Sequence, residues 1–282
     1  MIDRPGEQIA AAPANPPPDA PPDPLDSLEA AVGGRLGVIA MDSADGAVLL
    51  ARRPDERFAM CSSFKWALAA AVLARVDRGE LALAEPVPYA EADLLQHSPV
   101  TREHLAEGAM SLEALAEAAV VTSDNAAANL LLAKIGGPAG LTAFLRAEGD
   151  DTTRLDRTEP TLNENTPGDP RDTTTPRAMA TSLSRLLLGP SLSEASRARL
   201  MGWLRACETG KRRLRAGLPS AWPAGDKTGT CNSTTACDVA IVAPPGRAPV
   251  VIAAYLSEAR EPLEALDAVL AAVGREVAAR LA

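Results

Sequence analysis

Short apolar runs separated by turn residues occur near both ends of the chain. Residues 35–41 and 47–51 are apolar and flank a polar turn with an Asp-Gly pair, which predicts a β-hairpin. Near the other end, β-branched runs at 239–242 and 250–256 flank a Pro-Pro-Gly turn. They predict two further strands, followed by an alanine-rich C-terminal helix.

The middle of the chain has helical patterns instead. A run rich in alanine and leucine extends from Ser62 to Arg78 and stops at Gly79, which predicts a buried helix. Similar patterns predict five more helices, over 112–121, 126–135, 141–148, 176–188 and 193–207. We therefore expect an α+β fold in which an antiparallel sheet from both chain ends packs with helices. An all-helical lobe is inserted, and the active site lies between the lobes.

The same pattern suggests how the chain is organised. Residues 1–24 are rich in Pro, Ala and Asp, which predicts a disordered leader. Residues 25–56 and 208–282 would form the α/β lobe, and residues 57–207 the helical lobe. Within that lobe, the polar segment 150–175 carries three prolines. A loop of this length without a helix or strand of its own is typical of a functional segment.

Composition narrows the classes of function. The chain has 282 residues, 46% of them hydrophobic, and a net charge of -9. This acidity argues against nucleic acid or an anionic membrane as partner. The chain has no apolar run long enough for a membrane span and no recognisable signal peptide. Four cysteines and two histidines, without metal-site spacing, predict a metal-free protein.

Four polar clusters fall outside the apolar periodicity. They are Ser62-x-x-Lys65, Ser123-Asp124-Asn125, Glu159-Pro160-x-x-Asn163 and Lys227-Thr228-Gly229-Thr230. Taken singly, the first three have ordinary readings: a solvated lysine, a helix cap and a surface carboxylate. In this order and at these separations, however, they resemble the class A serine β-lactamases. The resemblance extends from about Leu25 to the C-terminus.

This resemblance implies a serine nucleophile, Ser62, and a hydrolytic water in place of a cofactor. Residues three apart on a helix share a face, so we expect the Lys65 amine within reach of the Ser62 hydroxyl. Whether Lys65 or Glu159 acts as the base in acylation stays open. For deacylation, the resemblance makes Glu159 the general base and Asn163 the residue that helps to hold the water.

The resemblance also assigns the other residues of the site. Ser123 would pass a proton to the leaving nitrogen, and Asn125 would bind the acylamino side chain of the substrate. The backbone N–H groups of Ser62 and Thr230 would form the oxyanion hole. The residues assigned to the substrate carboxylate are Lys227, Thr228, Thr230 and Arg213, on or beside an edge strand. Arg213 has a competing reading as a surface arginine.

The remaining assignments concern the borders of the site. His97 would wall one side of the cleft, unless it is a surface or gap-filling histidine. Arg157 and Asp172 would tie the neck of the 150–175 loop, unless they form only a weak exposed ion pair. The resemblance also implies a cis bond between Glu159 and Pro160.

The cysteines refine the resemblance. Cys61 precedes the nucleophile and Cys231 follows Thr230, a pair that resembles the disulfide beside the site of class A carbapenemases. Two buried free thiols are the alternative for this pair. Cys207 and Cys237 are expected to be free.

The resulting hypothesis is a periplasmic or secreted, monomeric serine β-lactamase that opens β-lactam antibiotics, carbapenems included, through an acyl-Ser62 intermediate. Two alternatives stay open. One is a D,D-peptidase, which would lack a deacylating carboxylate. The other is a non-catalytic β-lactam sensor domain, which would stay acylated.

Overall fold

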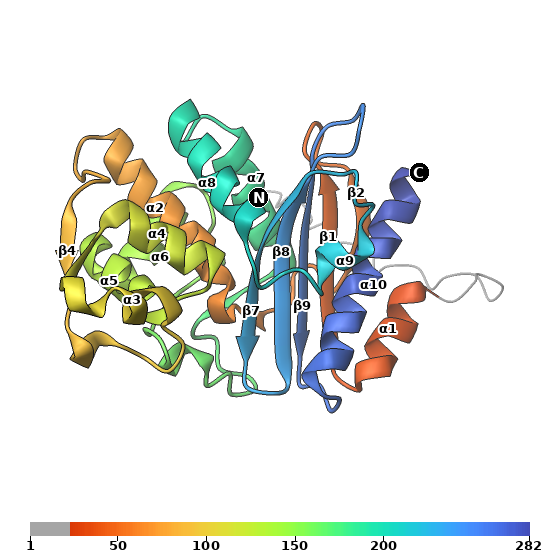
Figure 1. Cartoon of the computed structure of the whole chain (residues 1–282). Coiled ribbons are helices and arrows are strands. Elements are labelled where there is room, and N and C mark those ends of the chain that lie inside the picture. The colour runs from red at the N-terminus through yellow and green to blue at the C-terminus, as the bar shows by residue number, and fades with distance from the viewer. Residues whose placement is uncertain (1–22) are drawn as a thin grey trace, which may run out of the picture.

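The computed structural model describes residues 23–282 and contains a five-stranded antiparallel sheet in the order β2-β1-β9-β8-β7 (Figure 1). The strands are β1 (Arg35–Asp42), β2 (Val48–Arg52), β7 (Ala224–Cys231), β8 (Thr235–Val242) and β9 (Val250–Ser257). Strand β9 pairs with β1 along its whole length, so the two ends of the chain meet in one sheet. The predicted fold class is confirmed.

Three helices cover one face of the sheet (Figure 1). They are α1 (Pro24–Val32), α9 (Leu214–Gly217) and α10 (Leu263–Leu281). Helix α1 was not predicted, because the Pro-rich composition before it was read as a leader. Its signals are local: Asp23 caps the first turn by accepting from Leu25 N at 3.0 Å, and Pro24 begins the helix. The rest of the predicted leader lies outside the described residues.

The opposite face packs against the helical half of the molecule. Its helices are α2 (Lys65–Asp77), α3 (Pro99–Glu103), α4 (Leu112–Val121), α5 (Asn125–Ile135), α6 (Gly137–Ala147), α7 (Pro176–Leu188) and α8 (Glu194–Ala206). Helix α2 crosses the centre of this half, and its residues 65–74 are all buried. Within the described residues, no single helix is long and apolar enough to cross a membrane. Helices α5 and α6 reach that length and apolar composition only when they are taken together, and the chain bends by 70° between them.

The predicted helices are present, with differences at their ends. Helices α4 and α7 have the predicted bounds, α5 differs by one residue at its start, and α8 by one residue at each end. Helix α6 begins four residues earlier than predicted, because Pro138 fits a first helical turn and does not break the helix. The helix expected from Ser62 starts instead as a 3-10 turn, Cys61–Phe64, before α2.

The polar segment 150–175 leaves the helical half and returns to it. The prediction that this segment has no helix or strand of its own is wrong. It contains a 3-10 turn, Thr161–Asn163, and a short strand, β6 (Thr173–Thr174). Strand β6 pairs with β3 (Phe58–Ala59), just before the Ser62 turn. The other short strands, β4 (Pro86–Pro88) and β5 (Ala109–Ser111), pair at the far side of the helical half.

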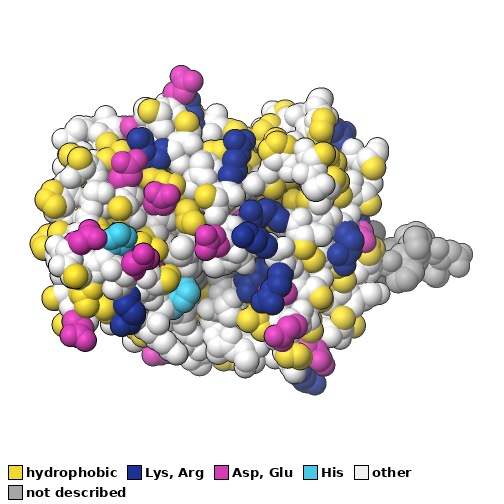
Figure 2. All heavy atoms as spheres, viewed as in Figure 1, with side chains coloured by type: hydrophobic (Ala, Val, Ile, Leu, Met, Phe, Trp, Pro, Cys, Tyr) yellow, Lys and Arg dark blue, Asp and Glu magenta, His cyan; other side chains and the backbone are white. Residues whose placement is uncertain are grey.

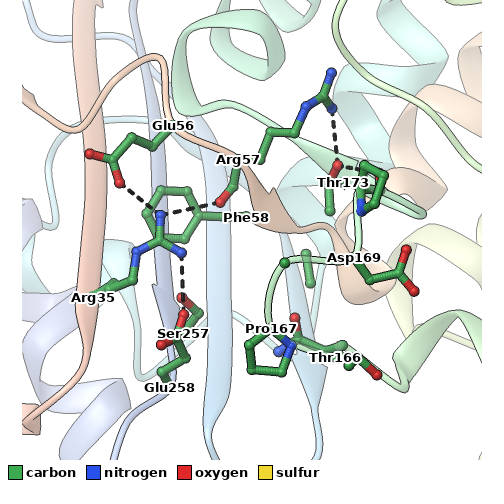
Figure 3. Close-up of a pocket in the computed structure, with 14 residues that line it drawn as sticks. Arg35, Glu56, Arg57, Phe58, Thr166, Pro167, Asp169, Thr173, Ser257 and Glu258 are labelled. Carbon is green, nitrogen blue, oxygen red and sulfur yellow. Dashed lines mark hydrogen bonds and ion pairs between the residues drawn. The ribbon is translucent and has the colours of Figure 1, made fainter.

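A cavity of about 310 Å³ separates the tip of this segment from the ends of β1 and β9 (Figure 3). On its wall, Arg35 donates to Glu56 at 2.7 Å and to Glu258 at 3.3 Å. The same guanidinium lies 4.6 Å from the centroid of the Phe58 ring. This network joins the start of β1 to β3, and thereby to the chain that leads into the Ser62 turn.

Two mid-helix glycines test how closely α9 and α10 approach each other. A Cβ on Gly274 of α10 would lie 2.3 Å from the Leu214 carbonyl oxygen, whereas a Cβ on Gly202 of α8 meets nothing within 4 Å. Gly202→Ala should raise the free energy of unfolding by about 0.5 to 1 kcal/mol, the ordinary helix gain. Gly274→Ala should lower the free energy of unfolding by about 1 to 3 kcal/mol, because the backbone of α9 or α10 must shift to make room for the methyl group. Urea unfolding followed by circular dichroism measures both; equal stabilities for the two variants would contradict the close approach.

Candidate active site

Most of the predicted site residues line one cavity of about 320 Å³ between the helical half and β7, whereas Lys65, Glu159 and Lys227 are buried and do not line it. Its walls are formed by Ser62, His97, Ser123, Asn125, Asn163, Thr209, Arg213, Thr228, Gly229, Thr230 and Leu263. These residues come from segments up to 201 positions apart, between Ser62 and Leu263. The fold therefore brings together what the sequence keeps separate. His97 is exposed on one wall, with Nε2 3.0 Å from the Thr122 carbonyl oxygen.

The Ser62 hydroxyl is hydrogen-bonded to the loop that carries Glu159. It donates to Glu159 Oε1 at 3.1 Å. Lys65 Nζ lies 3.1 Å from the same carboxylate oxygen. The structure joins the two residues through Glu159, whose Oε1 contacts both. Spacing along a helix gives the shared face, but the direction of a long side chain depends on its tertiary partners.

Lys65 is completely buried and is surrounded by acceptors. Besides Glu159, it donates to the Ser123 carbonyl oxygen at 2.8 Å and to Asn125 Oδ1. Burial lowers the pKa of Lys65 from 10.5 to about 8; the Glu159 carboxylate opposes this shift, and the nearby Lys227 adds to it. A proton on Lys65 is therefore far easier to remove than one on a solvated lysine.

The carboxylate of Glu159 is 3% exposed and is held from several sides. Asn163 Nδ2 donates to Glu159 Oε2 at 2.6 Å. The bond between Glu159 and Pro160 is cis, as predicted. Asn129 of α5 forms two hydrogen bonds with the Glu159 backbone, at 3.0 Å to its N–H and 2.8 Å to its carbonyl oxygen. The sequence analysis missed Asn129, whose only signal is its position four residues after Asn125 on the same helix.

The neck of the loop is an ion pair with one buried partner. Arg157 Nε donates to Asp172 Oδ2 at 2.6 Å, and Asp172 is 1% exposed. Asp172 also accepts from the backbone N–H groups of Asp156 and Arg157. A weak exposed pair, the alternative considered above, is excluded by this burial.

Ser123 connects the two buried lysines. Lys227 Nζ donates to the Ser123 hydroxyl at 3.1 Å, and Lys65 Nζ lies 3.4 Å from the same oxygen. Burial lowers the pKa of Lys227 as well. The neighbouring Asp124 caps α5 by accepting from Ala127 N at 2.9 Å, so the structural part of this cluster belongs to Asp124.

Strand β7 forms the opposite wall, at the edge of the sheet as predicted. Arg213 donates to the Thr230 hydroxyl at 2.7 Å and is held by Asp267 at 2.8 Å. Because Arg213 is only 5% exposed, its reading as a surface arginine is wrong. Thr209, which the sequence analysis missed, lies with its hydroxyl oxygen 2.5 Å from that of Thr228.

A disulfide joins the nucleophile turn to this strand. Cys61 and Cys231 are bonded, with their Cα atoms 5.4 Å apart, so the alternative of two free thiols at these positions is wrong. Cys207 and Cys237 are free and buried. Within residues 23–282, no group of three or more His, Cys, Asp or Glu side chains is placed to hold a metal ion.

Comparison with known proteins identifies the family. A model of the "Beta-lactamase enzyme family" matches residues 23–281. Beta-lactamase CTX-M-8 of Citrobacter amalonaticus is 48% identical over 253 residues, 90% of this chain and 86% of that protein. The carbapenem-hydrolyzing beta-lactamase KPC of Klebsiella oxytoca is 48% identical over 254 residues, again 90% of this chain and 86% of that protein.

A solved structure agrees with these matches. The ancestral GNCA class A β-lactamase shares 57% identity and a TM-score of 0.88, over 90% of this chain and 96% of that one. At this identity, over nearly the whole chain, the likeness extends beyond the fold to the family itself. The chain therefore belongs to the class A β-lactamases, cofactor-independent enzymes that hydrolyse the β-lactam ring.

Proposed function

We propose that the reaction proceeds through an acyl-enzyme on Ser62 and that Glu159 is the general base of deacylation. The observation that carries this assignment is the position of Glu159 Oε1, 3.1 Å from both the Ser62 hydroxyl oxygen and Lys65 Nζ. A carboxylate at this position can take a proton from the serine in one half-reaction and from water in the other.

In acylation, Ser62 Oγ attacks the lactam carbonyl carbon while its proton passes to Lys65, either directly or through the Glu159 carboxylate that contacts both groups, so that Glu159 is left ionised for deacylation. The backbone N–H groups of Ser62 and Thr230 stabilise the oxyanion. When the C–N bond breaks, the Ser123 hydroxyl gives its proton to the lactam nitrogen and regains one from the lysines. The distances of 3.1 Å to Lys227 and 3.4 Å to Lys65 support this relay.

In deacylation, water attacks the ester carbonyl, Glu159 takes the proton of the water, and the ester oxygen returns to Ser62 as a hydroxyl. Asn163, bonded to Glu159 Oε2, is suited to hold this water. A D,D-peptidase would lack such a deacylating carboxylate, and a sensor that stays acylated would not need one. The firmly held carboxylate beside the nucleophile therefore favours a β-lactamase over both alternatives.

Substrate recognition follows from the polar groups of the walls. Thr228, Thr230 and Arg213 would bind the carboxylate next to the lactam ring, with Lys227 behind them. Asn125 would bind the acylamino side chain, and His97 would close one side of the cleft. Apart from water, we assign no cofactor.

We extend the proposal to carbapenems. The disulfide ties the Ser62 turn to the strand that carries Thr230, so it fixes both oxyanion N–H groups relative to each other. One relative with 48% identity is a carbapenem-hydrolyzing enzyme. Because disulfides persist in oxidising compartments, we also propose that the enzyme is periplasmic or secreted. We further propose that it is a monomer without nucleic acid or membrane partners.

The first prediction separates the half-reactions. Glu159→Ala should still be acylated, because Lys65 remains to accept the Ser62 proton, but it should lose turnover, because the ester has no base to activate water. After mixing with benzylpenicillin, mass spectrometry should show a long-lived adduct on Ser62. Glu164→Ala, an exposed carboxylate of the same loop, is the control and should turn over. Parental turnover by Glu159→Ala would refute the assignment.

The second prediction concerns Lys65. Lys65→Met, similar in length but uncharged, should lower the rate constant of acylation with nitrocefin about 10²- to 10⁴-fold. Between pH 8 and 10.5 the unfolded chain keeps a proton on Lys65 that the folded chain has released. The free energy of unfolding of the parent, relative to Lys65→Met, should therefore rise across this window and stay flat below pH 8. Denaturant titrations at several pH values measure it; a difference independent of pH would show that the pKa of Lys65 is not lowered.

The third prediction concerns the disulfide. Replacing Cys61 and Cys231 by serine should lower the melting temperature, since the bond closes a loop of 170 residues, worth up to about 5 kcal/mol in the chain-entropy model. It should also reduce imipenem hydrolysis more than benzylpenicillin hydrolysis. Cys207→Ser, a free cysteine, is the control. An unchanged ratio of imipenem to benzylpenicillin activity would remove the disulfide from the carbapenem proposal.

A further inference from the structure

A basic island lies beside the cleft of this acidic protein. Residues 205–215 include five cations and one carboxylate, although the chain as a whole has a net charge of -9. The five cations are Arg205, Lys211, Arg212, Arg213 and Arg215. Figure 2 shows dark-blue side chains gathered in the middle of this face, where the segment between α8 and α9 crosses from the helical half to the sheet.

The island reaches the mouth of the cleft. Thr209 and Arg213 both line the cavity, and Lys211 lies between them in the chain. Because consecutive Cα atoms are about 3.8 Å apart, the Lys211 Cα lies within about 7.6 Å of each of these two residues. Lys211 is exposed, and the Arg212 side chain is 72% exposed. Both residues therefore lie beside the cavity wall, where their charges contribute to the potential at its mouth.

The positive charge of the island is only partly neutralised by its neighbours: Arg215 pairs with Asp226 at 2.7 Å, whereas Lys211, Arg212 and Arg213 have one carboxylate between them. Asp267 pairs with Arg213 at 2.8 Å and with Arg212 at 3.1 Å, so two guanidinium groups share one carboxylate. Among the residues that the structure describes, Lys211 makes no ion pair. An approaching anion therefore meets an excess of cations at this end of the cleft.

We infer that Lys211 and Arg212 form an anion-attracting surface that speeds the capture of anionic β-lactams and favours cephalosporins with an anionic C3 substituent. This inference rests on the proposed binding of the substrate carboxylate by Thr228, Thr230 and Arg213. In a cephalosporin, C3 is bonded to the carbon that carries this carboxylate, so the C3 substituent projects from the same end of the cleft. Charge at the mouth acts mainly on association, and salt weakens it.

Three cephalosporins with the same acyl side chain provide the test. Ceftriaxone carries an acidic heterocycle at C3, cefotaxime a neutral acetoxymethyl group and cefepime a cationic ring. In Lys211→Glu/Arg212→Glu, kcat/KM for ceftriaxone should fall roughly 3- to 10-fold at low ionic strength, for cefotaxime less, and for cefepime least. The kcat values should not change, and the differences should vanish near 0.5 M salt.

Matched variants distinguish the surface from other causes. Arg78→Glu/Arg280→Glu changes the net charge equally but at the ends of α2 and α10 remote from the cavity, and it should leave the ceftriaxone-to-cefepime ratio at the parental value. Lys211→Glu alone, which keeps the pair of Arg212 with Asp267, should lower that ratio by part of the full effect. An unchanged ratio in the Lys211 variants, or an equal change in the remote variant, would overturn the inference.

A separate variant tests the carboxylate site on which the inference rests. Arg213→Ala should lower kcat/KM for all three cephalosporins alike and at every salt concentration. If it does not, the carboxylate assignment fails and the inference loses its geometric basis, even though the hydrolysis of β-lactams stands.

Discussion

The site depends on a buried ion pair between Lys65 and Glu159, at 3.1 Å and with both side chains out of contact with solvent. Such a pair has lost its hydration, so it is tolerated only where geometry and further hydrogen bonds compensate. The surroundings supply them: Asn163 on the carboxylate, and Asn125 and the Ser123 carbonyl on the amine. Much of the helical half can be understood as the frame that holds these two charges together.

The frame begins with the loop that carries Glu159. Asp172 joins the two sides of the loop neck through Arg157 and two backbone N–H groups. Asn129 holds the Glu159 backbone against α5. On the other side, β7 must approach the Ser62 turn closely. A Cβ on Gly229 would lie 2.7 Å from the Met60 carbonyl oxygen, so a glycine is required there. The nearby disulfide holds the same two segments by a covalent bond.

The sequence predicts the regular elements and the identity of the reactive residues better than their contacts. Periodicity located α4 and α7 because their apolar faces pack on one core. It missed α1, whose signals are a cap and a proline, and misplaced the start of α6. The burial of Arg213 depends on Asp267, 54 residues away, and no local pattern encodes that contact. The path from Ser62 to Lys65 through Glu159 likewise depends on how a distant loop folds back.

The charges of the cleft fit the anionic substrate that we propose. Among the residues that the structure describes, Lys227 donates to two neutral oxygens, those of the Ser123 hydroxyl and the Thr228 backbone, at 3.1 and 2.8 Å. It is completely buried, and burial lowers its pKa because the charged form lacks water. A substrate carboxylate beside it would supply the missing negative charge and raise that pKa again. Protonation of Lys227 and binding of the anion therefore favour each other, so the cost of burying this cation without a carboxylate partner is recovered when an anionic substrate enters.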